Sequence, residues 1–73
     1  MAIPPQPIEI QVNGNVQCCP MGQRLPALLT QLHLNPRMIA IEYNGEILHR
    51  QFWDEWLVME GDRLEIVTIV GGG

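Results

Sequence analysis

The chain has no lysine: its four basic residues are all arginines, and eight acidic residues outnumber them, for a net charge of −4. Binding to nucleic acid requires clustered positive charge, so this composition argues against a nucleic-acid partner. An acidic surface suits a protein partner with a basic docking face, although it can also serve solubility alone. The sequence also lacks any apolar run near the roughly 20 residues that a helix needs to cross a bilayer. No membrane association is therefore expected.

Cysteine is equally scarce, with only Cys18 and Cys19, which are neighbours in the chain. Adjacent cysteines cannot join distant segments, so no disulfide framework is expected. No second pair of cysteines or histidines stands at metal-ligand spacing, so no metal site is expected either.

Residues 1–7 contain three prolines but neither the basic region nor the apolar core of a secretion signal. They predict a flexible leader and, with reduced thiols, a cytoplasmic protein.

Apolar and polar residues alternate at residues 8–12 and 63–70, which predicts two β-strands, and the mostly apolar residues 38–43 predict a third. Two Asn-Gly pairs predict tight hairpin turns, because a type I′ turn needs positive φ at both central residues. These turns lead into two return strands, 15–19 after Asn13-Gly14 and 46–49 after Asn44-Gly45. The two-residue loop of the first hairpin places Cys19 on the inner face of the sheet and Cys18 on the outer face.

Leucines at positions 25, 28, 29 and 32 follow the spacing of one helical face. They predict an amphipathic helix of about two and a half turns that begins near Arg24 or Leu25. Pro26 is tolerated in the first turn, where its missing N–H is not needed. Asn35-Pro36 is expected to end the helix.

Residues 50–57 place three aromatic side chains at the spacing of a helical turn: Phe52, Trp53 and Trp56. We expect them to belong to the core or to cover the open end of the sheet, rather than to bind a ligand. Several carboxylates in this part of the chain fall in turns beside solvent, and we expect no catalytic role for them: Asp54, Glu55, Glu60 and Asp62.

The order strand, strand, helix, strand, short strand, turn, strand indicates one architecture. The single helix has an apolar stripe that must cover a sheet, and the first and last strands can pair at the centre of that sheet. A right-handed crossover through the helix makes this pairing parallel. We therefore predict an α+β domain over residues 8–70, with a mixed sheet of 4–5 strands curled around one helix. This is the β-grasp, or ubiquitin-like, fold.

Three glycines, Gly71, Gly72 and Gly73, directly follow the strongest strand signal. A glycine run normally forms a turn or a linker, but this run stands at the end of the sequence. We predict that residues 71–73 form a mobile, exposed stalk that no side chain widens. Such a stalk suits the delivery of its own terminal carboxyl group into the buried active site of another protein.

Taken together, several segments resemble the ubiquitin-like sulfur carriers, most closely the ThiS family, which carries sulfur for the thiazole of thiamine. The resemblance runs from about Ile8 to Gly73. It is carried by Ile10-Gln11-Val12-Asn13-Gly14, the stretch Leu25 to Leu32, Ile41 to Leu48, Glu60 to Val67, and Val70 to Gly73. The proline-rich leader and Pro26 depart from the usual pattern of the family.

The resemblance implies a carrier protein with no catalytic residues and no bound cofactor. It implies that an E1-like adenylating enzyme of the ThiF type uses ATP to convert the carboxylate of Gly73 to an acyl-adenylate. A sulfur donor, such as a cysteine desulfurase system, then displaces AMP and leaves a thiocarboxylate on Gly73. A thiazole synthase of the ThiG type is the expected acceptor.

Strand alternation predicts the surface that docks these partners. Leu64, Ile66 and Thr68 should face the helix, which leaves their neighbours on the outer face of the sheet. The predicted partner-binding patch consists of Met38, Ala40, Glu42, Glu65, Val67 and Ile69. Its four apolar members should adjoin near the base of the glycine tail, and exposed apolar patches are often interaction sites.

Three other functions fit parts of the same pattern. The small subunit of molybdopterin synthase is also a sulfur carrier with this fold and a Gly-Gly end. A ubiquitin-like modifier would form isopeptide bonds with target lysines, and the absence of lysine excludes only self-linked chains. A plain interaction module with an accidental glycine tail is the remaining alternative.

Overall fold

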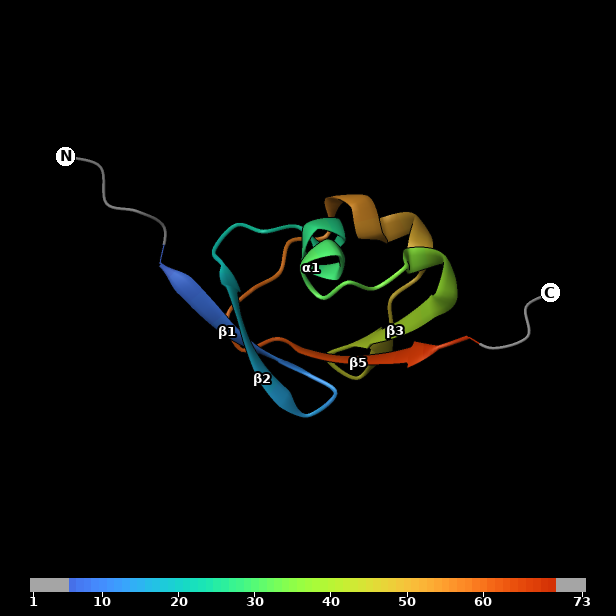
Figure 1. Ribbon diagram of the computed structural model, residues 1–73, viewed down its shortest axis with the longest axis horizontal. Coiled ribbons are helices and arrows are strands. Elements are labelled where there is room, and N and C mark those ends of the chain that lie inside the picture. Colours follow the sequence, from blue (N-terminus) through green and yellow to red (C-terminus); the bar gives the residue numbers. More distant parts are fainter. Residues whose placement is uncertain (1–5, 70–73) are drawn as a thin grey trace.

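The computed structural model describes residues 6–69 of the chain. Within this range a five-stranded sheet packs against one α-helix, and two 3-10 helices complete the domain (Figure 1). The elements are β1 (Pro7–Val12), β2 (Asn15–Pro20), α1 (Leu25–Gln31), η1 (Pro36–Met38), β3 (Ile39–Tyr43), β4 (Glu46–Ile47), η2 (Arg50–Glu55) and β5 (Arg63–Thr68). No helix within residues 6–69 has the length and apolarity that crossing a membrane requires.

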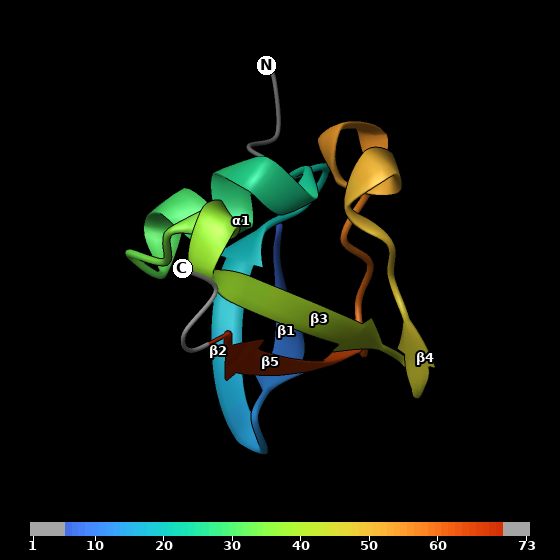
Figure 2. The same ribbon diagram turned by 90° about the vertical axis from the view of Figure 1, so that its right-hand side faces the viewer.

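The strands lie in the order β2-β1-β5-β3-β4, so the first and last strands pair at the centre of the sheet. Their pairing is parallel and brings Gln11 opposite Arg63 and Val12 opposite Leu64. The other neighbouring pairs are antiparallel. The helix α1 covers one face of this curled sheet (Figure 2). The predicted β-grasp arrangement, with its parallel central pair, is confirmed.

Both predicted hairpin turns have the positive φ angles of a type I′ turn. The angles are 52° and 82° at Asn13 and Gly14, and 50° and 88° at Asn44 and Gly45. In the first hairpin Cys19 is buried and Cys18 is exposed, as the two-residue loop predicted. Burial is the main reason why the pKa of the Cys19 thiol is raised.

The helix is shorter than predicted, because it ends at Gln31 and not at Asn35-Pro36. His33 takes a left-handed conformation, with φ 59°, and reverses the chain there. The N–H of Leu34 then donates to the carbonyl oxygen of Leu29 at 2.9 Å, which gives this carbonyl group in the last turn of the helix a hydrogen-bond partner. Asparagine and glycine are the usual residues at such a position, so the histidine gave no recognisable stop signal.

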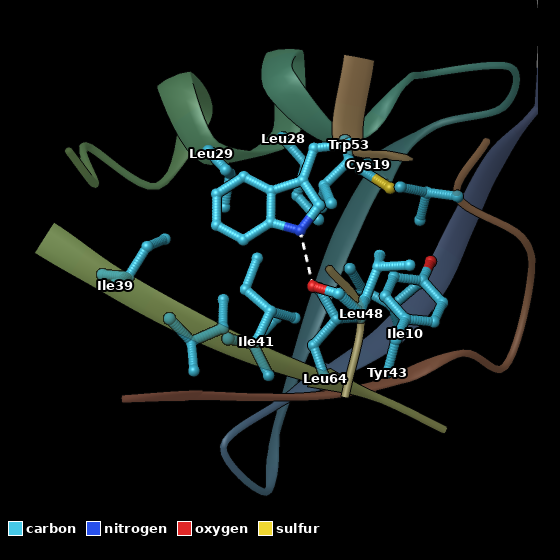
Figure 3. Close-up of a cluster of buried hydrophobic side chains, with 14 of the residues drawn as sticks. Ile10, Cys19, Leu28, Leu29, Ile39, Ile41, Tyr43, Leu48, Trp53 and Leu64 are labelled. Carbon is cyan, nitrogen blue, oxygen red and sulfur yellow. Dashed lines mark hydrogen bonds between the residues drawn. The ribbon is translucent and has the colours of Figure 1, made fainter. Parts of the chain in front are cut away.

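The core lies between the helix and the inner face of the sheet (Figure 3). Leu25, Leu28 and Leu29 are at most 2% exposed, while Leu32 is partly buried at the edge of the core. Trp53 is buried, and its indole N–H donates to the carbonyl oxygen of Leu48 at 2.8 Å. The predicted role in the core is therefore confirmed for Trp53.

The other two aromatic residues of this segment lie nearer to solvent. Trp56 is 36% exposed and packs edge-on against Tyr43, with ring centroids 5.4 Å apart. Phe52 is 50% exposed and therefore lies outside the core, so of the two predicted roles only that of covering the open end of the sheet is left for it. In the 3-10 turn of η2, Phe52 and Trp53 are consecutive residues and point in different directions, so only one of them can be buried.

Candidate functional site

The outer face of β3 and β5, opposite the helix, carries the predicted patch. Ala40 lies opposite Val67, and Glu42 lies opposite Glu65, in the antiparallel ladder between the two strands. The pairing continues one step beyond it, where the N–H of Ile69 donates to the carbonyl oxygen of Met38 at 2.6 Å. The structure thus brings the predicted residues together as three cross-strand pairs: Met38 with Ile69, Ala40 with Val67, and Glu42 with Glu65.

The apolar members of this patch are open to solvent. The exposed fractions are 48% for Met38, 59% for Val67 and 43% for Ile69, and Ala40 is partly buried. Met38 belongs to the end of η1 and not to the strand that the sequence predicted, because β3 begins at Ile39. Exposed apolar patches of this kind are often interaction sites.

Ile47 belongs to the same surface, although the sequence reasoning did not include it. It lies on β4 opposite Glu42 and is 69% exposed. With Ala40, Glu65 and Val67 it lines a shallow groove of about 220 Å³. The register of the Asn44-Gly45 hairpin already placed Ile47 on the outer face, and it was the signal that could have identified this residue.

In the sequence, β5 precedes the glycine residues. Asp62 stands directly before β5, and its side chain holds this end of the strand through hydrogen bonds. One carboxylate oxygen of Asp62 accepts from the hydroxyl of Tyr43 at 2.6 Å and from the N–H of Met59 at 2.8 Å. The other accepts from the side-chain amide of Asn44 at 3.1 Å. Burial and the contact with Asp62 raise the pKa of Tyr43 well above its usual value.

Asn13 holds the middle of β5 from the opposite side. Its side-chain oxygen accepts from the N–H of Ile66 at 2.7 Å, and its side-chain N–H donates to the carbonyl oxygen of Ile66 at 3.1 Å. The asparagine amide therefore pairs with both backbone groups of one β5 residue, as a neighbouring strand would.

The predicted modification site, Gly73, and the glycines Gly71 and Gly72 lie outside the described residues, as does the predicted mobility of residues 71–73. The structure places the last described residue, Ile69, at the edge of the apolar patch. Within residues 6–69, no cluster of three histidine, cysteine, aspartate or glutamate residues has a metal-binding arrangement.

The β-grasp sheet places the chain among the ubiquitin-like folds, and its last strand lies along an exposed apolar face. The model of the ThiS family matches residues 10–73. The chain belongs to the ThiS family, and is a sulfur carrier of the ThiS type rather than an enzyme. The family match thus covers all of the described site and the three glycines.

The chain is similar to several curated proteins. The sulfur carrier protein ThiS of Escherichia coli is 29% identical over 90% of this chain and 100% of its own. An uncharacterized protein, ycf40, of Porphyra purpurea is 39% identical over 90% of this chain and 93% of its own. A thiazole synthase of Paramagnetospirillum magneticum is 33% identical over 90% of this chain, which corresponds to 20% of that protein.

The fold has a solved counterpart in the crystal structure of the thiamine biosynthesis protein ThiS of Geobacter metallireducens. The two structures superimpose with a TM-score of 0.78 and 29% sequence identity. The match covers 90% of this chain and 100% of the other.

Proposed function

We propose that this protein carries sulfur for thiazole formation in thiamine biosynthesis as a thiocarboxylate on Gly73, in the cytoplasm. The observation that carries the proposal is the exposed apolar face of β3 and β5, which ends at Ile69, four residues before Gly73. The match to the ThiS family over residues 10–73 supports it.

The chemistry has two stages, because a carboxylate is too poor an electrophile for direct replacement of its oxygen. In the first, a carboxylate oxygen of Gly73 attacks the α-phosphorus of ATP on an activating enzyme, and pyrophosphate leaves. In the second, the terminal sulfur of a donor persulfide attacks the acyl carbon and AMP leaves, which gives an acyl disulfide. A thiol then attacks the donor's sulfur in that S–S bond and forms a disulfide with it, so that the thiocarboxylate is released and sulfur has replaced one oxygen. The carrier contributes reach and shape, and the activating enzyme contributes the catalytic groups and the ATP.

The glycines suit this role for two reasons. Three extended residues span about 10 Å, enough to bring a carboxyl group into a buried nucleotide site. A side chain at Gly72 or Gly73 would widen the chain and restrict its backbone. The domain itself stays outside the enzyme and docks through Met38, Ala40, Val67 and Ile69, with Glu42 and Glu65 facing basic groups of the partner.

We propose two protein partners and one sulfur source for the cycle. The activating enzyme is of the E1-like, ThiF type, and the acceptor is a thiazole synthase of the ThiG type. A match to one fifth of a thiazole synthase supports the second partner, because the carrier-like segment and the synthase occur there in one protein. A cysteine desulfurase system is the proposed donor.

ATP–pyrophosphate exchange by the activating enzyme tests which residue is the substrate. Deletion of Gly73 moves the carboxylate back by roughly 3.5 Å, and a displacement of 1 Å can cost about a hundredfold in rate. We expect exchange to collapse in the deletion variant and in Gly72→Val, while Gly72→Ala retains more activity. Full exchange with the deletion variant would contradict the proposal. Unchanged unfolding midpoints would show that all three variants remain folded.

A further inference from the structure

The hydrogen-bonding groups of β5 alternate between its two neighbours. The N–H of Asn44 donates to the carbonyl oxygen of Arg63, and the N–H of Ile69, just after β5, donates to the carbonyl oxygen of Met38. Arg63 and Ile69 therefore direct their backbone groups toward β3. In an antiparallel ladder such residues alternate with residues whose groups point the other way. Leu64, Ile66 and Thr68 therefore direct their N–H and C=O groups toward the side on which β1 lies.

On that side β1 ends before β5 does. The N–H of Asn13 donates to the carbonyl oxygen of Leu64 at 2.8 Å, and there the chain turns into the hairpin. The side chain of Asn13 then satisfies both backbone groups of Ile66, at 2.7 and 3.1 Å. The next residue on the same side is Thr68, which is exposed. Among residues 6–69, no group pairs with the backbone of Thr68 on this side.

A free edge of this kind is a template for an added strand, since an extended peptide gains main-chain hydrogen bonds there. Native proteins usually cover such edges or guard them with charge, proline or a bulge. Here Thr68 lies between the exposed apolar side chains of Val67 and Ile69. The open edge therefore continues the apolar patch on the outer face.

The position of Gly73 limits what can occupy this edge. Gly73 lies four residues after Ile69, a stretch of chain that spans at most about 14 Å. An enzyme that acts on Gly73 must therefore bring its own surface close to Thr68. We propose that the activating enzyme adds an extended segment to the β5 edge, with its backbone bonded to the N–H and C=O of Thr68.

This inference rests on the proposed reaction at Gly73, which identifies the occupant. The segment would present an apolar side chain to Val67 and Ile69 and a basic one to Glu65, because those groups border the edge on the outer face. Pairing at Thr68 would extend the sheet beyond the point where Asn13 ends it. The added strand would thereby align the residues that follow β5 with the active site.

Amide hydrogen exchange on the wild-type protein tests the contact directly, with and without the activating enzyme and without ATP. We expect exchange at Thr68 to slow at least about tenfold in the complex, as for a newly hydrogen-bonded amide. Ile66 is the internal control, because Asn13 already protects its amide in the free protein. Unchanged exchange at Thr68 in a formed complex, or failure of the two proteins to bind, would overturn the proposal.

Two variants at position 68 separate the backbone contribution from the side-chain contribution. Thr68→Pro removes the N–H without removing a bond to β3, and Thr68→Ala keeps the N–H. We expect binding of the enzyme to weaken at least about fivefold with proline and to remain near the wild-type value with alanine. Equal binding by the two variants would contradict edge pairing. If the proline variant fails to fold, replacement of the Thr68 amide by an ester removes the same donor and should give the same weakening.

Separate measurements test the edge contact and the reaction at Gly73, so either proposal can be contradicted without the other. Protection of Thr68 without pyrophosphate exchange would support the edge contact and contradict the adenylation of Gly73. Pyrophosphate exchange with an unprotected Thr68 would support adenylation and overturn the edge contact.

Discussion

The two faces of the sheet differ sharply within a single strand. On β5, Leu64 and Ile66 point toward the helix and are 1% and 7% exposed. Between and beyond them, Glu65 and Val67 point outward, and Val67 is 59% exposed. Because successive residues of a strand alternate between faces, one short segment can serve two purposes. The inner face stabilises the fold, and the outer face presents an unpartnered surface.

This separation means that stability and docking can be altered independently. Side chains on the inner face are enclosed by the helix, so removal of a methyl group there leaves a cavity. Side chains on the outer face contact few atoms of their own chain, so their replacement should leave the unfolding free energy nearly unchanged. Substitutions that break this rule would show that the two faces are coupled.

The largest expected effect on stability is at the inner face. Leu29→Ala should lower the free energy of unfolding by about 2–5 kcal/mol, because Leu29 is 2% exposed and packs in the core. Leu57→Ala is the matched control, since Leu57 is 46% exposed and should cost less than about 0.5 kcal/mol. Chemical denaturation measures both. Similar midpoints for the two variants would place Leu29 outside the core.

A smaller effect is expected where Asn13 ties the first hairpin to β5. Asn13→Gly keeps the positive φ of the turn but removes two hydrogen bonds to Ile66, which should cost about 1–2 kcal/mol. Asn13→Asp keeps the acceptor and loses the donor, so denaturation should place it between wild type and Asn13→Gly. A glycine variant as stable as wild type would show that the pairing contributes nothing to the fold.

The pH dependence of the free energy of unfolding should reveal the contact between Tyr43 and Asp62 on the inner side. The raised pKa of Tyr43 means that the folded protein retains this proton when the unfolded chain, with a pKa near 10.0, has lost it. The unfolded state then binds fewer protons, so stability is fully present below pH 10 and falls as the pH rises above it. Tyr43→Phe should reduce this fall, and Cys19, whose pKa is also raised, accounts for part of the remainder. Identical alkaline profiles for the two proteins would contradict the assignment.

The smallest effect on stability, with a large effect on binding, is expected at the outer face. Val67→Asp should change the unfolding free energy by less than about 0.5 kcal/mol. It should weaken docking to the activating enzyme by about tenfold or more, because an unpaired charge would be buried against an apolar surface. Val16→Asp is the matched control, since Val16 on β2 is 62% exposed and lies away from β3 and β5. Calorimetric titration of both variants would distinguish loss of this patch from a general effect of charge.

Local patterns in the sequence predicted most of the fold. The alternating strands, the two Asn-Gly turns and the leucine stripe each depend on neighbouring residues, and the parallel pairing follows from the handedness of the crossover. The outer patch followed from the same alternation. The features that were missed depend on contacts between distant residues or on an unusual backbone. Asn13 and Ile66 are 53 positions apart, and the left-handed conformation of His33 has no glycine or asparagine to indicate it.

The central claim is that sulfur is carried at Gly73 and that the described domain only positions this residue. The most direct measurement is the intact mass of the protein after incubation with ATP, the activating enzyme and a sulfur source, followed by mapping of the C-terminal peptide. We predict a mass increase equal to the replacement of one oxygen by sulfur, located on Gly73. An unchanged mass would contradict the claim, and so would the addition of a whole sulfur atom at Cys18, the exposed cysteine.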